Sequence, residues 1–435
     1  MNTDRFKDFD ADVRELVLAF EAGRRGRPLF FDADQVEVIA DYYLEVGDVE
    51  GMKAAIELGE KLYPSNTDIR LRRAHLYGVQ GHLQQALHLL KELERAEPDN
   101  TDVAYSLGTL FSAMGEGKES IGYFLKAAND GYELGMIYGN IGDEYDKLGN
   151  TAQAVRYYRK AIAHNPNEER SLYHLSGIWD RQGRHTQSEQ YFSRHVEEHP
   201  YCKAGWFCLG DAYLALGLHS KAVDAFEYAL AIDKTYFDAY IHLYFAYYEM
   251  GDFAEAVRVL RDSLDYADDR ADILANIGYT YRDAGNYHTA TVYLHDSIKE
   301  DPSNANVWGA LGYCSVQLGY LDEAEGYYRR AISLDPDFSE IWWLDLADLY
   351  IRQQRFADAA TLLEDAYGEG IFSFDLESRL LYSYYKLGRR NHFFDLLVRE
   401  AYMFGNKYST LFDDYPELGQ DLEVATSIAF LTKKE

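Results

Sequence analysis

The sequence predicts an all-α solenoid built from a repeated helix-turn-helix motif, and three observations lead to this fold class. The first is a series of glycines spaced 34 residues apart, running from Gly47 to Gly319. The second is a series of prolines in one phase of the same period, which includes Pro64 and Pro336. The third is that apolar residues between these markers recur at the i, i+3, i+4, i+7 spacing of one helix face. A fixed period of this length is typical of stacked repeats.

The turn glycine, placed at position 15 of each repeat, divides the chain into eleven repeats. Nine of them follow without interruption: 33–66, 67–100, 101–134, 135–168, 169–202, 203–236, 237–270, 271–304 and 305–338. One inserted residue, Ser339, precedes 340–373 and 374–407, in which position 15 is Gln354 and Gly388. We expect 1–32 to be an N-terminal capping segment and 408–435 a C-terminal capping helix or tail, because the end repeats of a solenoid need a cover.

Each repeat is predicted to hold two helices joined at the turn glycine. Positions 4, 7, 8 and 11 form the buried face of the first helix, and positions 20, 24 and 27 that of the second. In the 203–236 repeat these residues are Trp206, Leu209, Gly210, Tyr213, Ala222, Phe226 and Ala229. A proline at position 32, where present, ends the second helix, because the residue before a proline avoids the α region.

Two stretches, "AGWFCLGDAYLALGLHSKAVDAFEYALAID" and "NVWGALGYCSVQLGYLDEAEGYYRRAISLDPD", carry a family signature. A large residue at position 4, Leu-Gly at 7 and 8, Tyr at 11, Ala at 20 and Pro at 32 resemble the tetratricopeptide repeat. The resemblance covers 33–407 and implies a right-handed α-solenoid of about eleven repeats, without enzymatic activity. Tyr244 departs from it at position 8, where a small residue is expected, and Ser315 departs at position 11.

Composition restricts the setting and the partners. The 73 Asp and Glu residues outnumber the 43 Lys and Arg residues, which gives a formal net charge of −30 and argues against nucleic acid as a partner. The three cysteines have no disulfide or metal-ligand spacing. The chain shows no signal peptide and no apolar run long enough for membrane insertion. We therefore expect a cytoplasmic location, no cofactor and no membrane insertion.

The string "SRHVEEHP" at 193–200 matches the H-x-x-E-H motif of inverted zinc peptidases through His195, Glu198 and His199. Residues i and i+4 share a helix face and could hold one metal ion. A catalytic zinc site also needs a third ligand, and Pro200 ends the helix directly after His199. The string is better explained as a helix end, so we predict no metal site and no catalytic residue.

Positions 2, 5, 9, 12 and 13 lie on the side of the first helix opposite the buried face, which in tetratricopeptide arrays lines a concave groove. In the first four repeats this side is acidic, and Lys147 is its only Lys or Arg. The predicted acidic groove consists of Asp34, Glu37, Asp41, Glu45, Asp68, Asp102, Asp143 and Asp146. The alternative is a solvated face that keeps the chain soluble.

Along the rest of the chain the same positions carry aromatic residues and isolated arginines. The predicted partner-binding groove consists of Tyr105, Arg170, Tyr173, Phe207, Phe245, Tyr248, Tyr279, Arg282 and Tyr313. Exposed aromatic residues are common anchors of protein interfaces. The alternative is that these rings only stack on neighbouring repeats, and the sequence does not decide between the two.

The sequence thus predicts an interaction scaffold or adaptor. Its partner would be a protein or peptide segment with basic and apolar or aromatic residues, bound in the groove. Self-association into a structural assembly is the first alternative, since an exposed aromatic stripe would serve it equally well. A metal-dependent hydrolase at the H-x-x-E-H string is the remote alternative.

Overall fold

The computed structural model describes residues 11–24, 30–130, 133–335 and 340–432. Across these ranges the regular secondary structure is helical, with no β-strand, which confirms the predicted fold class. The chain divides into two compact units, an N-terminal unit (Met1–Leu218) and a C-terminal unit (His219–Glu435). The division falls between the two helices of the 203–236 repeat. No helix in the described ranges is long and apolar enough to span a membrane.

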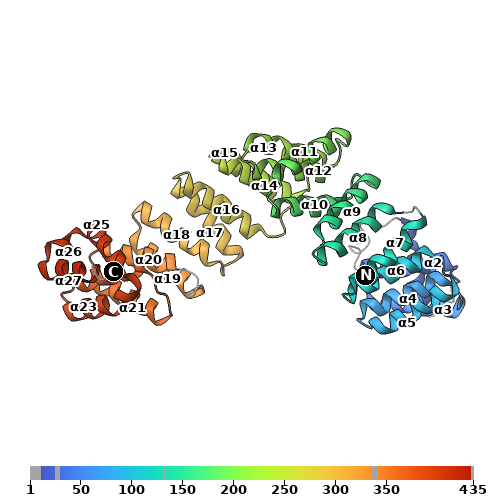
Figure 1. Cartoon of the computed structure of the whole chain (residues 1–435), viewed down its shortest axis with the longest axis horizontal. Coiled ribbons are helices and arrows are strands. Elements are labelled where there is room, and N and C mark those ends of the chain that lie inside the picture. Colours follow the sequence, from blue (N-terminus) through green and yellow to red (C-terminus); the bar gives the residue numbers. More distant parts are fainter. Residues whose placement is uncertain (1–10, 25–29, 131–132, 336–339, 433–435) are drawn as a thin grey trace. The chain divides into compact units, whose positions relative to one another are not determined.

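In the N-terminal unit, consecutive helices pack against one another along the chain, as Figure 1 shows. They are α1 (Ala11–Arg24), α2 (Ala33–Glu45), α3 (Val49–Leu62), α4 (Thr67–Val79), α5 (Leu83–Ala96), α6 (Thr101–Ala113), α7 (Gly117–Ala127), η2 (Ala128–Asp130), α8 (Leu134–Lys147), α9 (Thr151–His164), α10 (Glu169–Arg181), α11 (His185–Glu198) and α12 (Lys203–Ala215). From α2 onward, even-numbered helices are the first helices of the predicted repeats and odd-numbered ones the second.

The C-terminal unit continues the same alternation up to α23 and then changes to short helices (Figure 1). Its helices are α13 (His219–Ile232), α14 (Phe237–Glu249), α15 (Phe253–Ser263), α16 (Arg270–Asp283), α17 (Tyr287–Glu300), α18 (Ala305–Leu318), α19 (Leu321–Leu334), α20 (Glu340–Arg352), α21 (Phe356–Gly368), α22 (Phe374–Lys386), α23 (Arg390–Arg399), α24 (Ala401–Phe404), η3 (Gly405–Thr410), α25 (Leu411–Asp414), α26 (Pro416–Gln420) and α27 (Leu422–Thr432). The inserted residue Ser339 lies outside the described residues.

The turn between the helices of a repeat needs one residue in the left-handed region. The nine glycines from Gly47 to Gly319 have φ angles between 65° and 82°. Glycine reaches these angles without the steric cost that a Cβ brings. In the 340–373 repeat, where position 15 is not a glycine, Gln354 adopts the same conformation, with φ of 60°. The turn geometry is therefore kept even where the residue is unfavourable.

Close approach of the paired helices explains the small residue at position 8. A Cβ added at Gly142 would lie 2.6 Å from Cε1 of Tyr158, which is residue 24 of the same repeat. Gly108 and Gly312 face Phe124 and Tyr328 in the same way. The exception is Tyr244, which is buried and whose hydroxyl lies 3.4 Å from the Thr280 hydroxyl on the next first helix.

Aromatic residues at positions 11 and 23 form a second recurring contact within repeats. Phe111 and Tyr123 stack with ring centroids 5.4 Å apart, and Tyr145 and Tyr157 do so at the same distance. Such pairs contribute about 0.5–1.5 kcal/mol beyond the area that they bury. Much of the tyrosine content of the chain is therefore used in helix packing.

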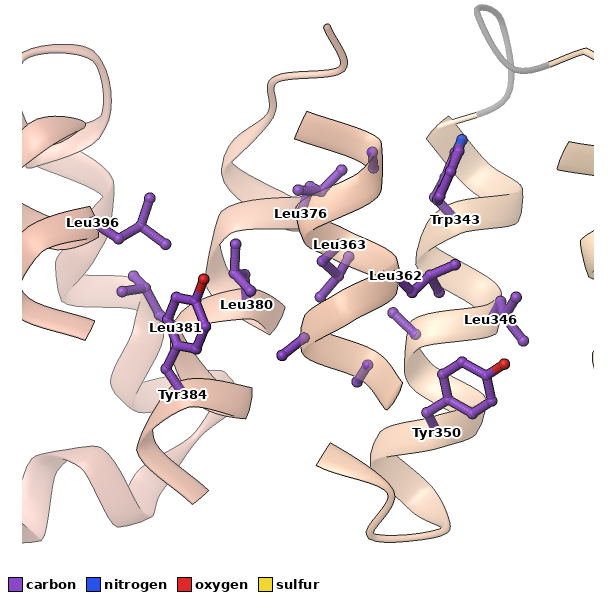
Figure 2. Close-up of a cluster of buried hydrophobic side chains, with 14 of the residues drawn as sticks. Trp343, Leu346, Tyr350, Leu362, Leu363, Leu376, Leu380, Leu381, Tyr384 and Leu396 are labelled. Carbon is purple, nitrogen blue, oxygen red and sulfur yellow. The ribbon is translucent and has the colours of Figure 1, made fainter. Parts of the chain in front are cut away.

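Helices outside the predicted repeats pack against the first and last of these repeats. In the N-terminal unit, Phe20 of α1 is buried and packs edge to face on Tyr43 of α2. In the C-terminal unit, Leu411, Leu418 and Ile428 are buried in the same core as helices α20 to α23. Figure 2 shows the centre of that core, where Leu362, Leu376 and Tyr384 lie among leucines of neighbouring helices.

Candidate functional site

The side of the first helices opposite their buried residues, which we call the first-helix face, carries exposed aromatic side chains in the C-terminal unit. Phe245 on α14 is 49% exposed and Tyr313 on α18 is 39% exposed, while Tyr279 on α16 is half-buried. Among the described residues, no ring contact joins any two of these three. They occupy position 9 of three successive repeats. The three rings therefore do not stack on one another.

A hydrogen-bonded group fixes the polar surroundings of these aromatic residues. The Tyr248 hydroxyl donates to Oδ2 of Asp283 over 2.6 Å, and Nε of Arg282 donates to Oδ1 over 2.8 Å. The guanidinium of Arg282 also lies 5.3 Å from the ring centroid of Tyr279. The hydrogen bond to Asp283, together with burial, raises the pKa of Tyr248 to about 12. Arg282 is therefore a paired cation that orients Tyr279, not an isolated positive charge.

Two of the predicted groove residues of the N-terminal unit, Tyr105 and Arg170, form hydrogen bonds or ion pairs with neighbouring side chains. Arg170 donates to the Oδ1 atom of Asn140 over 2.6 Å and pairs with Asp143 at 3.2 Å. The Tyr105 hydroxyl accepts a hydrogen bond from Asn140 over 3.2 Å. Tyr105, Asn140, Arg170 and Asp143 thus form one connected polar group across three first helices.

Phe207 does not suit the role that the sequence suggested for it. Phe207 is only 7% exposed, and its ring lies edge to face against Tyr173, with centroids 5.8 Å apart. A buried ring offers little surface to a partner, so Phe207 belongs to the packing of α10 against α12. Tyr173 is half-buried in the same contact.

The acidic face of the first repeats contains a cation that the selected positions missed. Arg72, at position 6 of its repeat, binds Asp41 at 2.9 Å and lies 3.6 Å from Glu37. Burial raises the pKa of Glu37, with a further contribution from Asp34, Asp41 and Asp68, while Arg72 opposes the change. Position 6 of the following repeat therefore has to be counted in the charge of this face.

The other predicted acidic residues differ in their partners. Asp146 lies 3.6 Å from Arg181, and Asp143 pairs with Arg170 as described above. Asp102 on α6 and Glu45 on α2 are exposed and form no ion pair with any residue in the described ranges. Asp41, Asp143 and Asp146 thus each face an arginine, which reduces the net negative charge at these three positions of the face.

The H-x-x-E-H string lies in the last turns of α11. His195 is buried, and its Nε2 atom lies 3.1 Å from the carbonyl oxygen of Pro166. Burial is the main cause that lowers the pKa of His195. No group of three His, Cys, Asp or Glu residues within the described ranges is arranged to hold a metal ion. His195 is accounted for as a structural residue that ties α11 to the loop between α9 and α10.

These observations define a helical repeat protein in which each helix pair buries its apolar face against its neighbours. Family models of the tetratricopeptide repeat match residues 71–133 and 140–201, and a second set matches 213–276, 281–342 and 317–366. The chain belongs to the tetratricopeptide repeat family, as the sequence predicted. Membership in this family supports a role as a protein-interaction scaffold in general.

The chain was also matched to solved structures, whereas no curated protein matches it. The structure of MamA is 20% identical, with a TM-score of 0.31 over 45% of this chain and 95% of that one. YrrB, described as a TPR protein with an unusual peptide-binding site, is 17% identical, with a TM-score of 0.34 over 41% and 91%. The Cut9–Hcn1 hetero-tetramer of APC/C gives 12% identity and a TM-score of 0.36 over 97% and 94%.

Proposed function

We propose that the protein is a non-enzymatic scaffold that binds a partner protein segment on the first-helix face of its C-terminal unit. The observation that carries the proposal is the exposure of Phe245 and Tyr313 at equivalent positions of first helices, with Tyr279 in the repeat between them. Aromatic rings bury a large area on binding and lose little side-chain entropy, which makes them frequent interface anchors.

Surrounding polar contacts support this assignment. The Tyr248–Asp283–Arg282 group holds its side chains in place before any partner arrives, and a preorganised surface loses less entropy on binding. The segment that fits is extended or helical and presents apolar or aromatic side chains to the rings. Basic residues in the partner would suit the net charge of −30 and, in the N-terminal unit, the carboxylates of the first-helix face.

The proposal is tested by comparing three forms of the full-length chain as bait in a pull-down. The test form carries Phe245→Ala, Tyr279→Ala and Tyr313→Ala. A control form carries Tyr228→Ala and Tyr320→Ala, which remove rings of 55% and 49% exposure from other surfaces of the same unit. We expect a partner that the wild type and the control form retain and the test form loses.

Each retained protein is then titrated in purified form against the three chains. Equal affinity for wild type and test form would exclude this face as the binding site. Concentration-dependent mass in sedimentation, lost only in the test form, would identify the partner as a second copy of the chain. Circular dichroism establishes that all three forms have the same helix content.

A further inference from the structure

A cavity on the second-helix side of the N-terminal unit is separate from the first-helix face. It has a volume of about 870 Å³ and lies between α9 and α11, with Trp179 of α10 also lining it. Four cations line the cavity, together with one carboxylate, Glu198: Arg156, Arg159, Lys160 and Arg194. In a chain with a net charge of −30, such a concentration of positive charge is unexpected.

The same place two repeats earlier shows how this protein normally balances such cations. There, Lys91 lies 4.6 Å above the ring of Tyr123. Glu94 lies between Lys91 and Lys126 and forms an ion pair with each, with N–O distances of 3.1 Å. One carboxylate thus bridges two cations on neighbouring second helices.

Two repeat lengths later, the cations and the tyrosine recur but the carboxylate does not. Arg159 replaces Lys91 and lies 5.4 Å above Tyr191, and Arg194 replaces Lys126. The position of Glu94 is taken by Ile162, which is 3% exposed and lines the cavity. The place of a bridging carboxylate is therefore left without one.

A second carboxylate is exchanged in the same comparison. Glu92, which pairs with Arg70 at 3.0 Å, corresponds to Lys160. Lys160 lies 5.0 Å from the ring centroid of Tyr138, the counterpart of Arg70. Among the described residues, none of the four cavity cations forms an ion pair with a carboxylate.

Trp179, one of the residues that line the cavity, also has an unused hydrogen-bond donor. Trp179 corresponds to Phe111 of the earlier repeat, so the exchange adds an indole N–H. This Nε1 atom is buried and has no hydrogen-bond partner in the described part of the chain. Buried N–H groups without a partner are rare and call for an explanation.

We propose that this cavity binds a small phosphate-bearing ligand, whose phosphate oxygens take the place that the Glu94 carboxylate occupies between the earlier pair of cations. Arginine guanidinium groups bind phosphate oxygens through paired hydrogen bonds, which favours phosphate over a single carboxylate here. The volume is that of a site for a nucleotide-sized molecule. This ligand site is independent of the proposed partner face, which lies on first helices of the other unit.

The test is calorimetric titration of the full-length chain with pyrophosphate and with ATP at constant ionic strength. We expect saturable binding of both, and a shift of the Trp179 indole resonance in ¹H–¹⁵N spectra, assigned with Trp179→Phe. Equal affinities would mean that the phosphate chain is the recognised part. Tighter binding of ATP would add a contact with the nucleoside. Absence of binding by both probes would overturn the proposal.

Two variants and a matched control make the test specific. Ile162→Glu supplies the missing carboxylate, and Arg194→Gln removes a cation from an exposed position; each is expected to weaken binding at least tenfold. Arg184→Gln removes the same charge outside the cavity and should change affinity less than twofold. An equal loss in Arg184→Gln and Arg194→Gln would show only general charge attraction and would refute the site. Arg194→Gln decides the matter if Ile162→Glu does not fold.

Discussion

Substitution of Gly142 by alanine tests the helix packing that defines each repeat. Gly142 lies in the middle of α8, where alanine would ordinarily stabilise a helix by about 0.5–1 kcal/mol because it lowers the backbone entropy lost on folding. The structure predicts the opposite sign here. A Cβ at this position would lie 2.6 Å and 2.7 Å from two ring carbons of Tyr158, whereas ordinary contacts begin near 3.4 Å.

The magnitude follows from what Tyr158 can do. Its ring is fully buried, and its hydroxyl donates to Oδ1 of Asp143 over 2.7 Å. To relieve the overlap, the ring or the α8–α9 pair must shift by about 1 Å, which costs about 1–3 kcal/mol for overpacking in a filled core. Misalignment of the hydroxyl adds about 1 kcal/mol. After the propensity gain, we expect a net loss of about 2 kcal/mol.

The assay is urea unfolding followed by circular dichroism, with Gly122→Ala as the matched control. Gly122 is exposed within α7, and a Cβ there would meet nothing within 4 Å. We expect the free energy of unfolding to fall by about 2 kcal/mol for Gly142→Ala and to rise by about 0.5–1 kcal/mol for Gly122→Ala. If Gly142→Ala were as stable as Gly122→Ala, the close approach of α8 and α9 would be refuted as the reason for a small residue at position 8.

Three further predictions concern stability and reactivity. Burial raises the pKa of Glu377 to about 7, so in the native state it keeps a proton that the unfolded chain, with its ordinary value of 4.5, releases. Glu377 should therefore make stability fall by up to about 3 kcal/mol as the pH rises from about 4.5 to 7. The fall should be smaller by that amount in Glu377→Gln, and parallel pH profiles would contradict this. Gln354→Gly should raise the free energy of unfolding by about 0.5–1 kcal/mol because Gln354 has a φ of 60°. An unchanged free energy of unfolding would mean that the turn is not strained. Burial raises the pKa of Cys208 and of the other two thiols. A thiol reagent at pH 8 should therefore label no cysteine rapidly in the native chain and all three after denaturation. Rapid labelling of the folded chain would instead show an exposed thiol.

The fold was predictable because one period fixes three independent requirements at once. The residue at position 15 must reach positive φ, the residue at position 8 must leave room for position 24, and position 11 must fill the core. Gly149, Gly142 and Tyr145 meet these requirements within a single repeat. Even Gln354 obeys the turn, since the packing of α20 on α21 sets the backbone regardless of the side chain.

Candidate binding residues were less predictable, because exposure depends on the neighbouring repeat and not on the position within one. Phe207 and Phe245 are both aromatic residues of the first-helix face, yet the first is 7% exposed and the second 49%. Phe207 packs against Tyr173 of the preceding first helix, whereas Phe245 has its ring contact with its chain neighbour Tyr244. A periodic pattern gives the side of the helix but not what covers it.

The cavity between α9 and α11 extends this reasoning from shape to charge. A single repeat does not reveal that Arg159 lacks a carboxylate, because its counterpart Lys91 obtains one from Glu94, three residues further along its own helix. Only the comparison of repeats two periods apart shows that Ile162 has replaced that carboxylate while Arg194 has been kept as a cation. In a repeat protein each repeat can thus serve as a reference for the equivalent positions of the others. A cation that has a carboxylate partner in one repeat and none at the equivalent position of another indicates where an external anion can bind. This is why we place the ligand site at this cavity.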